Sequence, residues 1–297
     1  MRSPSPRPEV VAVFGPTASG KTGVAESLAS RLGTDVVSAD ALQVYRGLPI
    51  LTNQPTRPTR LVAIRELSEE MSLGEYAGLA HAEVDELVDA HGSAVVAGGT
   101  GLYLRAALVD LRVPPAPSPG ARERWETVYD ADAGHALERL AELDQAAAAV
   151  VHRNDRRRVV RALELAETGA SLVAEHDRLW SGDPRRPTLV VGLEVPEDAL
   201  ALRIEARARE MFDRGVVEEV RRALAAPVSR TAEKALGLRE LAEFPRDDAF
   251  ERIVARTRHY ATYQRKWMRR IPGIVMIEAD RPPDEVASAI LEVARAR

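Results

Sequence analysis

The chain has 297 residues, a formal net charge of −4 and an apolar content of 45%, which suits one large domain or a core domain with an insertion. The absence of cysteine excludes disulfides, thiolate zinc sites and cysteine nucleophiles. No apolar run reaches membrane-spanning length, and the first residues lack the apolar segment of a signal peptide. We therefore expect a cytoplasmic protein that has no membrane partner.

Short β-branched segments alternate with helical patterns along most of the chain. After a Pro/Ser-rich tail at residues 1–8, which we expect to be disordered, the predicted strands cover 9–14, 36–39, 94–98, 188–195 and 273–279. The predicted helices cover 21–32, 75–91, 197–225 and 249–270. This alternation is typical of an α/β fold whose parallel sheet is covered by helices on both faces.

The middle of the chain departs from this alternation. A proline-rich break at 113–120 is followed by a purely helical pattern from Ala121 to about Glu175, and a second break covers 181–187. We interpret residues 119–187 as a helical insertion domain. The segments on either side, 9–118 and 188–297, then form a single α/β core.

The first motif is a phosphate-binding loop, "GPTASGKT" at residues 15–22, between a predicted strand and a predicted helix. Its glycines let backbone N–H groups converge on phosphate oxygens, and the start of the helix adds positive charge. Lys21 supplies a point charge, and the Thr22 hydroxyl is placed to bind Mg²⁺. The core is therefore predicted to be P-loop NTPase-like. The candidate residues for binding a diphosphate or a nucleotide are Gly15, Pro16, Thr17, Ala18, Ser19, Gly20, Lys21 and Thr22.

The apparatus that a P-loop hydrolase needs, namely an acid for Mg²⁺ at the end of a strand and a residue that positions water, is weakly represented in this chain. The predicted strand 94–98 runs into "GGTGLY" without a carboxylate. Asp40 is the one carboxylate at a strand end near the loop in an open-sheet layout. This pattern favours a small kinase, or a transferase for which the phosphate group is a leaving group.

Two stretches are basic although the whole chain is acidic. Residues 152–161 hold five arginines against one aspartate, and residues 252–270 hold seven Lys/Arg with no acid and with Tyr260, Tyr263 and Trp267 interleaved. One such run is most often a solvated helix face. Two of them, one carrying aromatic residues, favour an RNA partner.

Taken together, the motifs resemble the tRNA dimethylallyltransferase family, also called tRNA isopentenyltransferases. The first block is shared with many phosphate binders, but the combination and its order are specific. The blocks are "GPTASGKT" (15–22), "SADALQVYRGL" (38–48), "AGGTGLYLRA" (97–106), "NDRRRVVRALELAETG" (154–169), "RIEARAREMFDRGVVEEV" (203–220), "KALGLREL" (234–241) and "TRHYATYQRKWMRR" (257–270).

This resemblance implies a Mg²⁺-dependent reaction. A dimethylallyl group moves from dimethylallyl diphosphate to N6 of the adenosine directly 3′ of the anticodon, in tRNAs that read codons starting with U. The partners would be dimethylallyl diphosphate and the tRNA anticodon stem-loop, and we expect a monomer. The phosphate loop would then hold a diphosphate that is discarded.

The catalytic candidates are Lys21, Asp40 and Thr100. Asp40 is assigned as the general base that accepts the N6 proton. Thr100 would hydrogen-bond the reacting phosphate oxygen or the adenine. By resemblance, Arg207, or Arg203 on the same predicted helix, also contacts the diphosphate.

The resemblance also implies two groups of tRNA contacts. Asp40, Ala41, Leu42, Gln43 and Thr100 would line the opening for the flipped adenosine. The anticodon stem-loop would be contacted by Arg122, Arg157, Arg158, Val159, Val160 and Arg161.

Several positions differ from the usual family pattern, among them Arg157, where glutamine is usual, and Thr262-Tyr263, where a Lys-Arg pair is usual. Ala41 stands where serine is usual, "ILTNQPT" (50–56) replaces "IGTAKPT", and "TRLVAIRE" (59–66) replaces an "HHL-D" segment. Three rival functions remain: an isopentenyltransferase that uses free AMP, ADP or ATP, a small-molecule kinase, and a non-catalytic RNA-binding protein. The arginine-rich insertion favours tRNA over a free nucleotide, and the intact Lys21 and Asp40 favour catalysis.

Overall fold

The computed structural model describes residues 7–111, 118–173 and 183–297, so the expected disordered tail at 1–8 lies mostly outside the described residues. The chain divides into two compact units. The first unit combines residues 1–110 with 183–297, and the second holds residues 111–182. No helix among the described residues has the length and apolarity needed to cross a membrane.

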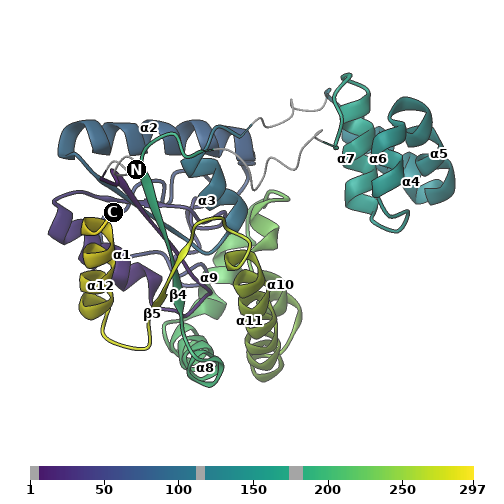
Figure 1. Cartoon of the computed structure of the whole chain (residues 1–297). Coiled ribbons are helices and arrows are strands. Elements are labelled where there is room, and N and C mark those ends of the chain that lie inside the picture. Colours follow the sequence, from purple (N-terminus) through teal and green to yellow (C-terminus); the bar gives the residue numbers. More distant parts are fainter. Residues whose placement is uncertain (1–6, 112–117, 174–182) are drawn as a thin grey trace, which may run out of the picture. The chain divides into compact units, whose positions relative to one another are not determined.

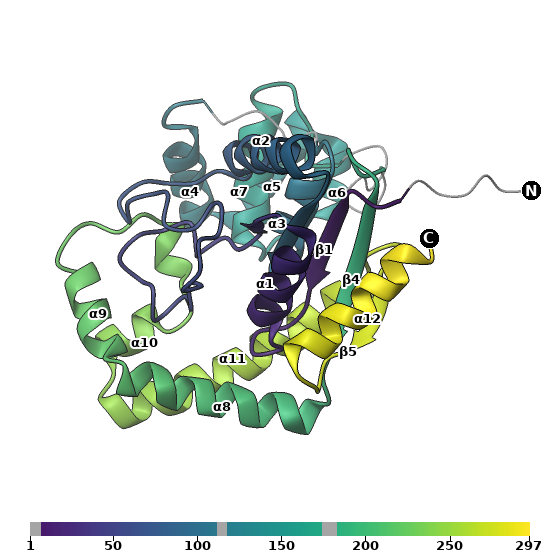
Figure 2. The same cartoon turned by 90° about the vertical axis from the view of Figure 1, so that its left-hand side faces the viewer.

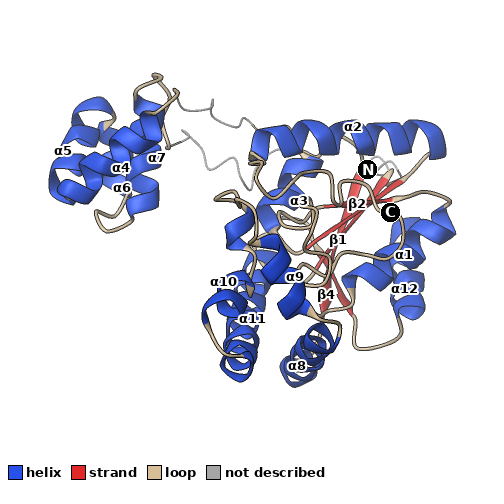
Figure 3. Ribbon diagram, turned by 180° about the vertical axis from the view of Figure 1, so that it is seen from behind, coloured by secondary structure: helices blue, strands red, loops and turns tan. Residues whose placement is uncertain are grey.

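A five-stranded parallel sheet in the order β2-β3-β1-β4-β5 forms the centre of the first unit (Figure 3). The α/β, P-loop NTPase-like fold class is thus confirmed. Val10 of β1 lies opposite Ala94 of β3 on one side and Thr188 of β4 on the other. The strands are β1 (Val10–Phe14), β2 (Val36–Ser38), β3 (Ala94–Gly98), β4 (Thr188–Glu194) and β5 (Val275–Glu278).

Helices cover both faces of this sheet (Figure 1). On one face α1 and α12 lie side by side (Figure 2), and α2 and α3 pack against the other. The helices of the first unit are α1 (Lys21–Leu32), α2 (Leu73–His91), α3 (Gly101–Leu108), α8 (Glu197–Asp213), α9 (Val216–Ala223), α10 (Leu238–Glu243), α11 (Arg246–Met268) and α12 (Pro283–Arg295), with a 3₁₀ turn at Ala232–Lys234.

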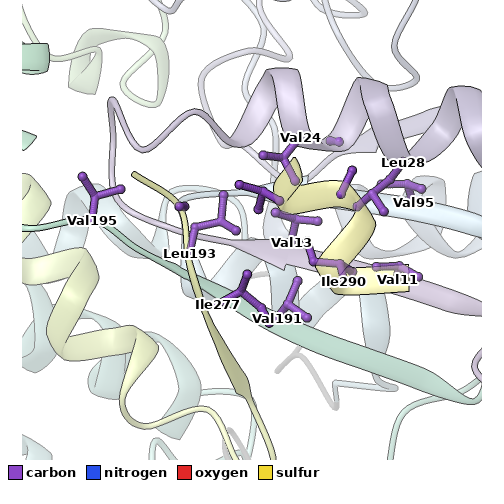
Figure 4. Packing of buried hydrophobic residues seen from close by; sticks show 14 of the residues in the cluster. Val11, Val13, Val24, Leu28, Val95, Val191, Leu193, Val195, Ile277 and Ile290 are labelled. Atoms are coloured by element: carbon purple, nitrogen blue, oxygen red, sulfur yellow. The ribbon is translucent and has the colours of Figure 1, made fainter. Parts of the chain in front are cut away.

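The core explains why the strand sequences are almost continuously apolar. All five residues of β1 are buried, as expected for a parallel strand that is covered on both faces. Val13, Leu193 and Ile290, from β1, β4 and α12, belong to one apolar cluster (Figure 4). This packing fixes the carboxyl ends of the strands, where the candidate site lies.

The second unit is a helical bundle with its own core. Ala136, Leu140, Val159 and Leu163 are fully buried in it. Asp155 caps the fourth helix by accepting a hydrogen bond from the N–H of Arg158. The helices are α4 (Ala121–Ala131), α5 (Ala133–Leu143), α6 (Gln145–Val150) and α7 (Arg156–Ala166).

Candidate active site

The loops that follow three neighbouring strands meet at one edge of the sheet. Because β3 lies between β1 and β2, the loops that leave these strands at Gly15, Ala39 and Gly99 come together, at the place where ligands bind in open parallel sheets. The cavity at this edge is lined by Lys21, Thr22, Ala25, Glu26, Val36, Ser38, Asp40, Gln43, Pro55, Thr59, Ala97 and Gly98.

The phosphate loop has a backbone shape suited to an anion. Ala18 and Gly20 have positive φ angles of 62° and 86°, and Ser19 between them does not. Such alternation turns successive N–H groups toward one concave side. Gly20 is the N-cap residue of α1 and has no side chain that could accept a hydrogen bond from the helix. The first N–H groups of α1 therefore remain available to a ligand. The Ser19 hydroxyl is buried and has no hydrogen-bond partner among the described residues.

We expect Gly20→Ala to lower the free energy of unfolding by about 1–2 kcal/mol, because alanine is strained at positive φ. A Cβ at Gly20 would meet nothing within 4 Å, so the strain of the backbone is the whole effect. The control is Gly78→Ala in α2, where a Cβ also has open space and φ is not positive. That change should raise stability by about 1 kcal/mol. Urea unfolding measures both, and equal effects of the two substitutions would contradict the strained-loop account.

Lys21, the first residue of α1, lies inside the loop. Its Nζ donates a hydrogen bond to the carbonyl oxygen of Pro16 at 2.7 Å. Burial lowers the pKa of Lys21 to about 8, the charge of Asp40 raises it and the charge of Arg207 lowers it. The ammonium group is thus held in a poorly solvated place near a second cation. An arriving anion would relieve both costs.

Arg207 on α8 is the second cation at the loop. Its Nη1 donates to the Thr17 hydroxyl at 2.8 Å, and its Nε is buried without a hydrogen-bond partner. Burial lowers the pKa of Arg207, which the charge of Asp40 offsets in part. Arg203, one turn earlier, instead donates to Asp280 at 2.5 Å. Of the two arginines, Arg207 is the one that the fold brings to the phosphate loop.

Asp40 follows β2 and lines the same cavity as Lys21. Its Oδ1 accepts a hydrogen bond from the N–H of Leu42 at 3.0 Å, which fixes the carboxylate at the start of a turn. The same charge acts on Lys21 and Arg207, so this carboxylate faces both cations. One carboxylate and two cations therefore share one site.

Thr100 caps the start of α3 but makes no side-chain capping bond. Its hydroxyl lies 3.5 Å from the hydroxyl of Tyr260 on α11. Burial raises the pKa of Tyr260, and the charge of Asp40 raises it further. Tyr260 therefore belongs to the site, although the sequence marked it only as an aromatic within a basic run.

The side chain of Gln43 is used within the protein. Its Oε1 accepts from the Ser38 hydroxyl at 2.9 Å, and its Nε2 donates to the carbonyl oxygens of Thr52 and Asn53 at 3.3 and 2.9 Å. Ala41 and Leu42 lie beside it in a partly exposed turn. Gln43 thus holds the segment 50–56 against the turn that carries Asp40.

The departures from the family pattern have structural roles. Gln54 donates its Nε2 to the carbonyl oxygens of Gln43 and Tyr45 at 3.3 and 2.7 Å, so a neutral amide ties this segment to the Asp40 turn. Leu51 is buried in an apolar cluster. Arg60 pairs with Asp35 and Glu83 at 3.1 and 2.9 Å.

In the helical unit, Arg122 and Arg161 share a buried carboxylate. The Glu164 side chain is fully buried. Arg122 donates Nε and Nη2 to it at 2.6 and 3.2 Å, and Arg161 donates Nη1 at 2.9 Å. These hydrogen bonds lower the pKa of Glu164 against the opposing effect of burial. Both arginines therefore stabilise the unit, whatever else they contact.

The other residues of this segment divide into two kinds. Arg157 and Arg158 are exposed, whereas Val159 and Val160 are 0% and 3% exposed. The side chains of residues 159 and 160 are buried, and the expectation that these two residues contact tRNA stays a prediction. The apolar residues in "RRRVVRALELA" recur at the spacing of one helix face, and this spacing could have predicted that the valines are buried.

The residues at the cavity suit a magnesium ion. Its lining includes Thr22, Ser38 and Asp40, whose side chains carry oxygen atoms, and oxygen is the ligand atom that Mg²⁺ prefers. The described residues contain no group of three or more His, Asp or Glu side chains that would hold a metal by themselves. Thr22 would therefore hold the ion together with oxygens of the ligand.

The fold and the site together are typical of a P-loop protein whose phosphate loop lies beside a carboxylate. The IPP transferase family model matches residues 43–271, and the isopentenyl transferase model matches residues 8–67. The chain is 36% identical over 293 residues to the tRNA dimethylallyltransferase of Corynebacterium jeikeium, with 94% of each chain covered.

Solved structures agree with this similarity. The tRNA isopentenylpyrophosphate transferase from Bacillus halodurans has a TM-score of 0.68 at 27% identity and covers 97% of this chain and 95% of its own. A eukaryotic dimethylallyltransferase acting on tRNA has a TM-score of 0.77 at 23% identity, with 97% and 79% covered, which supports the fold. The chain belongs to the IPP transferase family of tRNA dimethylallyltransferases, and it is a prenyl-transferring enzyme.

Proposed function

We propose that the chain transfers a dimethylallyl group from dimethylallyl diphosphate to N6 of the adenosine 3′-adjacent to the anticodon, in tRNAs that read codons starting with U. The C–O bond of the donor breaks, a C–N bond forms, N6 loses a proton and diphosphate leaves. The observation that carries the proposal is the placement of Asp40 opposite the cations of a complete phosphate loop.

The donor half of the site suits a leaving diphosphate. Negative charge grows on the leaving oxygens as the allylic C–O bond breaks, and groups already aimed at that place stabilise the transition state. Lys21, Arg207 and the N–H groups of the loop supply this stabilisation. The unpartnered Nε of Arg207 and hydroxyl of Ser19 are free to bind phosphate oxygens. A magnesium ion held by Thr22 would supply further positive charge to the diphosphate.

The acceptor half needs a base and a place for the purine. Asp40 is held by the Leu42 N–H on one oxygen, and it accepts the N6 proton as the C–N bond forms. Thr100 and Tyr260 lie near the same carboxylate and would hydrogen-bond the adenine. The adenosine leaves the anticodon loop to reach them, which costs little in a single-stranded loop.

Arg157 and Arg158 are proposed to contact the phosphates of the anticodon stem-loop. We expect the substitution of both residues by alanine to weaken tRNA binding. It should also reduce the steepness of log K against log salt by about one to two, because binding releases roughly one counterion fewer for each phosphate contact that is lost. Arg161 is left intact because its loss would deprive the buried, charged Glu164 of one of its ion-pair partners. Binding titrations at several salt concentrations measure the effect.

A control separates this effect from a general loss of surface charge. Arg139 on α5 is also exposed, with a neighbouring Glu142, and Arg139→Ala should leave the slope unchanged. An unchanged slope in the Arg157/Arg158 variant would remove this segment from the RNA contact.

The acceptor can be tested directly. The protein is incubated with Mg²⁺, dimethylallyl diphosphate and one of three acceptors: an anticodon stem-loop with the 3′-adjacent adenosine, the same stem-loop with guanosine at that position, or AMP. We expect transfer to the first only. Transfer to AMP at an equal or higher rate would replace the tRNA proposal by a free-nucleotide transferase.

A further inference from the structure

One buried side chain of α11 joins the donor loop to the acceptor loop. Gln264 is 4% exposed. Its Oε1 accepts a hydrogen bond from the N–H of Thr17, in the phosphate loop, at 2.8 Å. Its Nε2 donates to the carbonyl oxygen of Gly99, the residue before Thr100, at 2.7 Å. Both ends of the amide are therefore bonded to backbone groups of the two loops.

The surroundings leave Gln264 little freedom. A Cβ at Gly99 would lie 2.4 Å from Nε2 of Gln264 and 3.4 Å from Nζ of Lys21, so this glycine lets the amide and the ammonium approach the same backbone. One turn further along α11, Trp267 fills the space over Gly101, where a Cβ would lie 2.2 Å from the ring. Helix α11 therefore packs directly against the start of α3.

The phosphate loop is consequently held from two sides at Thr17. Gln264 engages the N–H of Thr17, and Arg207 engages its hydroxyl at 2.8 Å. Groups that stabilise a transition state act best when they are fixed before the ligand arrives. Gln264 thus adds a second link between the two loops, just beyond the last paired residues of β1 and β3, Phe14 and Gly98.

We infer that Gln264 is a positioning residue, which sets the phosphate loop and the Thr100 loop at the separation that the transfer requires. This inference rests on the proposed function, since it assigns the donor to one loop and the acceptor to the other. Gln264 acts through Thr17 and Gly99 and does not itself contact the reacting atoms.

The test compares Gln264→Met with the wild type. Methionine keeps the side-chain volume and loses both hydrogen bonds. We expect the affinity for inorganic diphosphate, measured by calorimetry, to fall at least fivefold, and the single-turnover rate of transfer to fall at least tenfold. Binding of the anticodon stem-loop should change less than twofold. Gln264→Asn keeps the amide but is one methylene shorter, so it cannot reach both loops and should lose rate as well.

The control is Ile253→Val, which removes one buried methyl group from α11. Ile253 packs in the apolar cluster that contains Leu51 and Leu238, and Gln264 is not part of that cluster. It should lower the melting temperature without changing diphosphate affinity or rate. If the wild type transfers no prenyl group, the proposed function fails. If the wild type transfers, and both Gln264 variants match it in diphosphate affinity and in single-turnover rate, the positioning role fails, even where they melt at lower temperature. Should Gln264→Met not fold, Gln264→Asn decides by the same two measurements.

Discussion

Asp40→Asn should lower the single-turnover rate of prenyl transfer by roughly a hundred- to ten-thousand-fold, the usual cost of losing a general base. The asparagine keeps the oxygen that accepts the Leu42 N–H, so the turn should keep its shape. The nearby phenols do not replace the carboxylate, because burial raises the pKa of Tyr103 to about 12 and also raises that of Tyr260. Affinity for the tRNA stem-loop should stay within a few-fold of wild type.

Rapid-quench kinetics with enzyme in excess isolates this step from product release. The rate should fall at alkaline pH as Lys21 loses its proton. Asp40→Asn should move this fall to lower pH, because the charge of Asp40 raises the pKa of Lys21 and the asparagine lacks that charge. An asparagine variant that transfers at a near wild-type rate would show that Asp40 serves only to hold the turn.

Lys21→Met should lower the rate of transfer by about a hundredfold or more, since one charged donor to the leaving group is lost. In the wild type, donor binding should be strongest below pH 8 and should weaken as pH rises through about 8, where Lys21 loses its proton. This limb should be absent from the residual activity of the methionine variant. A retained limb near pH 8 would assign it to another group.

The same substitution should make the protein more stable at neutral pH. The pKa of Lys21 falls from 10.5 to about 8 on folding, so the unfolded chain binds more protons between these values and stability rises with pH through this window. Below pH 8 the buried charge costs its full amount, on the order of 3 kcal/mol, because one pKa unit corresponds to about 1.4 kcal/mol. Urea unfolding should show a higher free energy of unfolding for Lys21→Met than for the wild type at pH 7, and no such difference at pH 10.5.

The sheet could be predicted closely because parallel strands are buried on both faces. The five predicted strands all exist, and 94–98 has the predicted bounds. Helices were harder to place. The predicted helix 197–225 is two helices, α8 and α9, because Gly215 takes a positive φ of 88° between them. Helix α3 was not predicted, since all but one of its residues are buried and no amphipathic period marks it.

The site could be predicted where it lies in one contiguous motif. Lys21 and Thr22 of the phosphate loop meet Asp40 at one cavity, as the parallel topology leads one to expect. Gln264 could not be assigned, because its partners are Thr17 and Gly99, which only the folded chain brings near α11. In α7 the basic run favoured an RNA partner, but the sequence did not show that Arg161 is paired with a buried glutamate or that Val159 is core.

The most direct test of the central claim follows both products of one reaction. The protein is incubated with Mg²⁺, dimethylallyl diphosphate and an anticodon stem-loop, the RNA is digested to nucleosides for mass spectrometry, and released diphosphate is quantified. We predict N6-dimethylallyladenosine and diphosphate in equal amounts, both lost in Asp40→Asn. Diphosphate release without a prenylated nucleoside, or a phosphorylated product formed with ATP in place of the prenyl donor, would contradict the assignment of the phosphate loop to a leaving group.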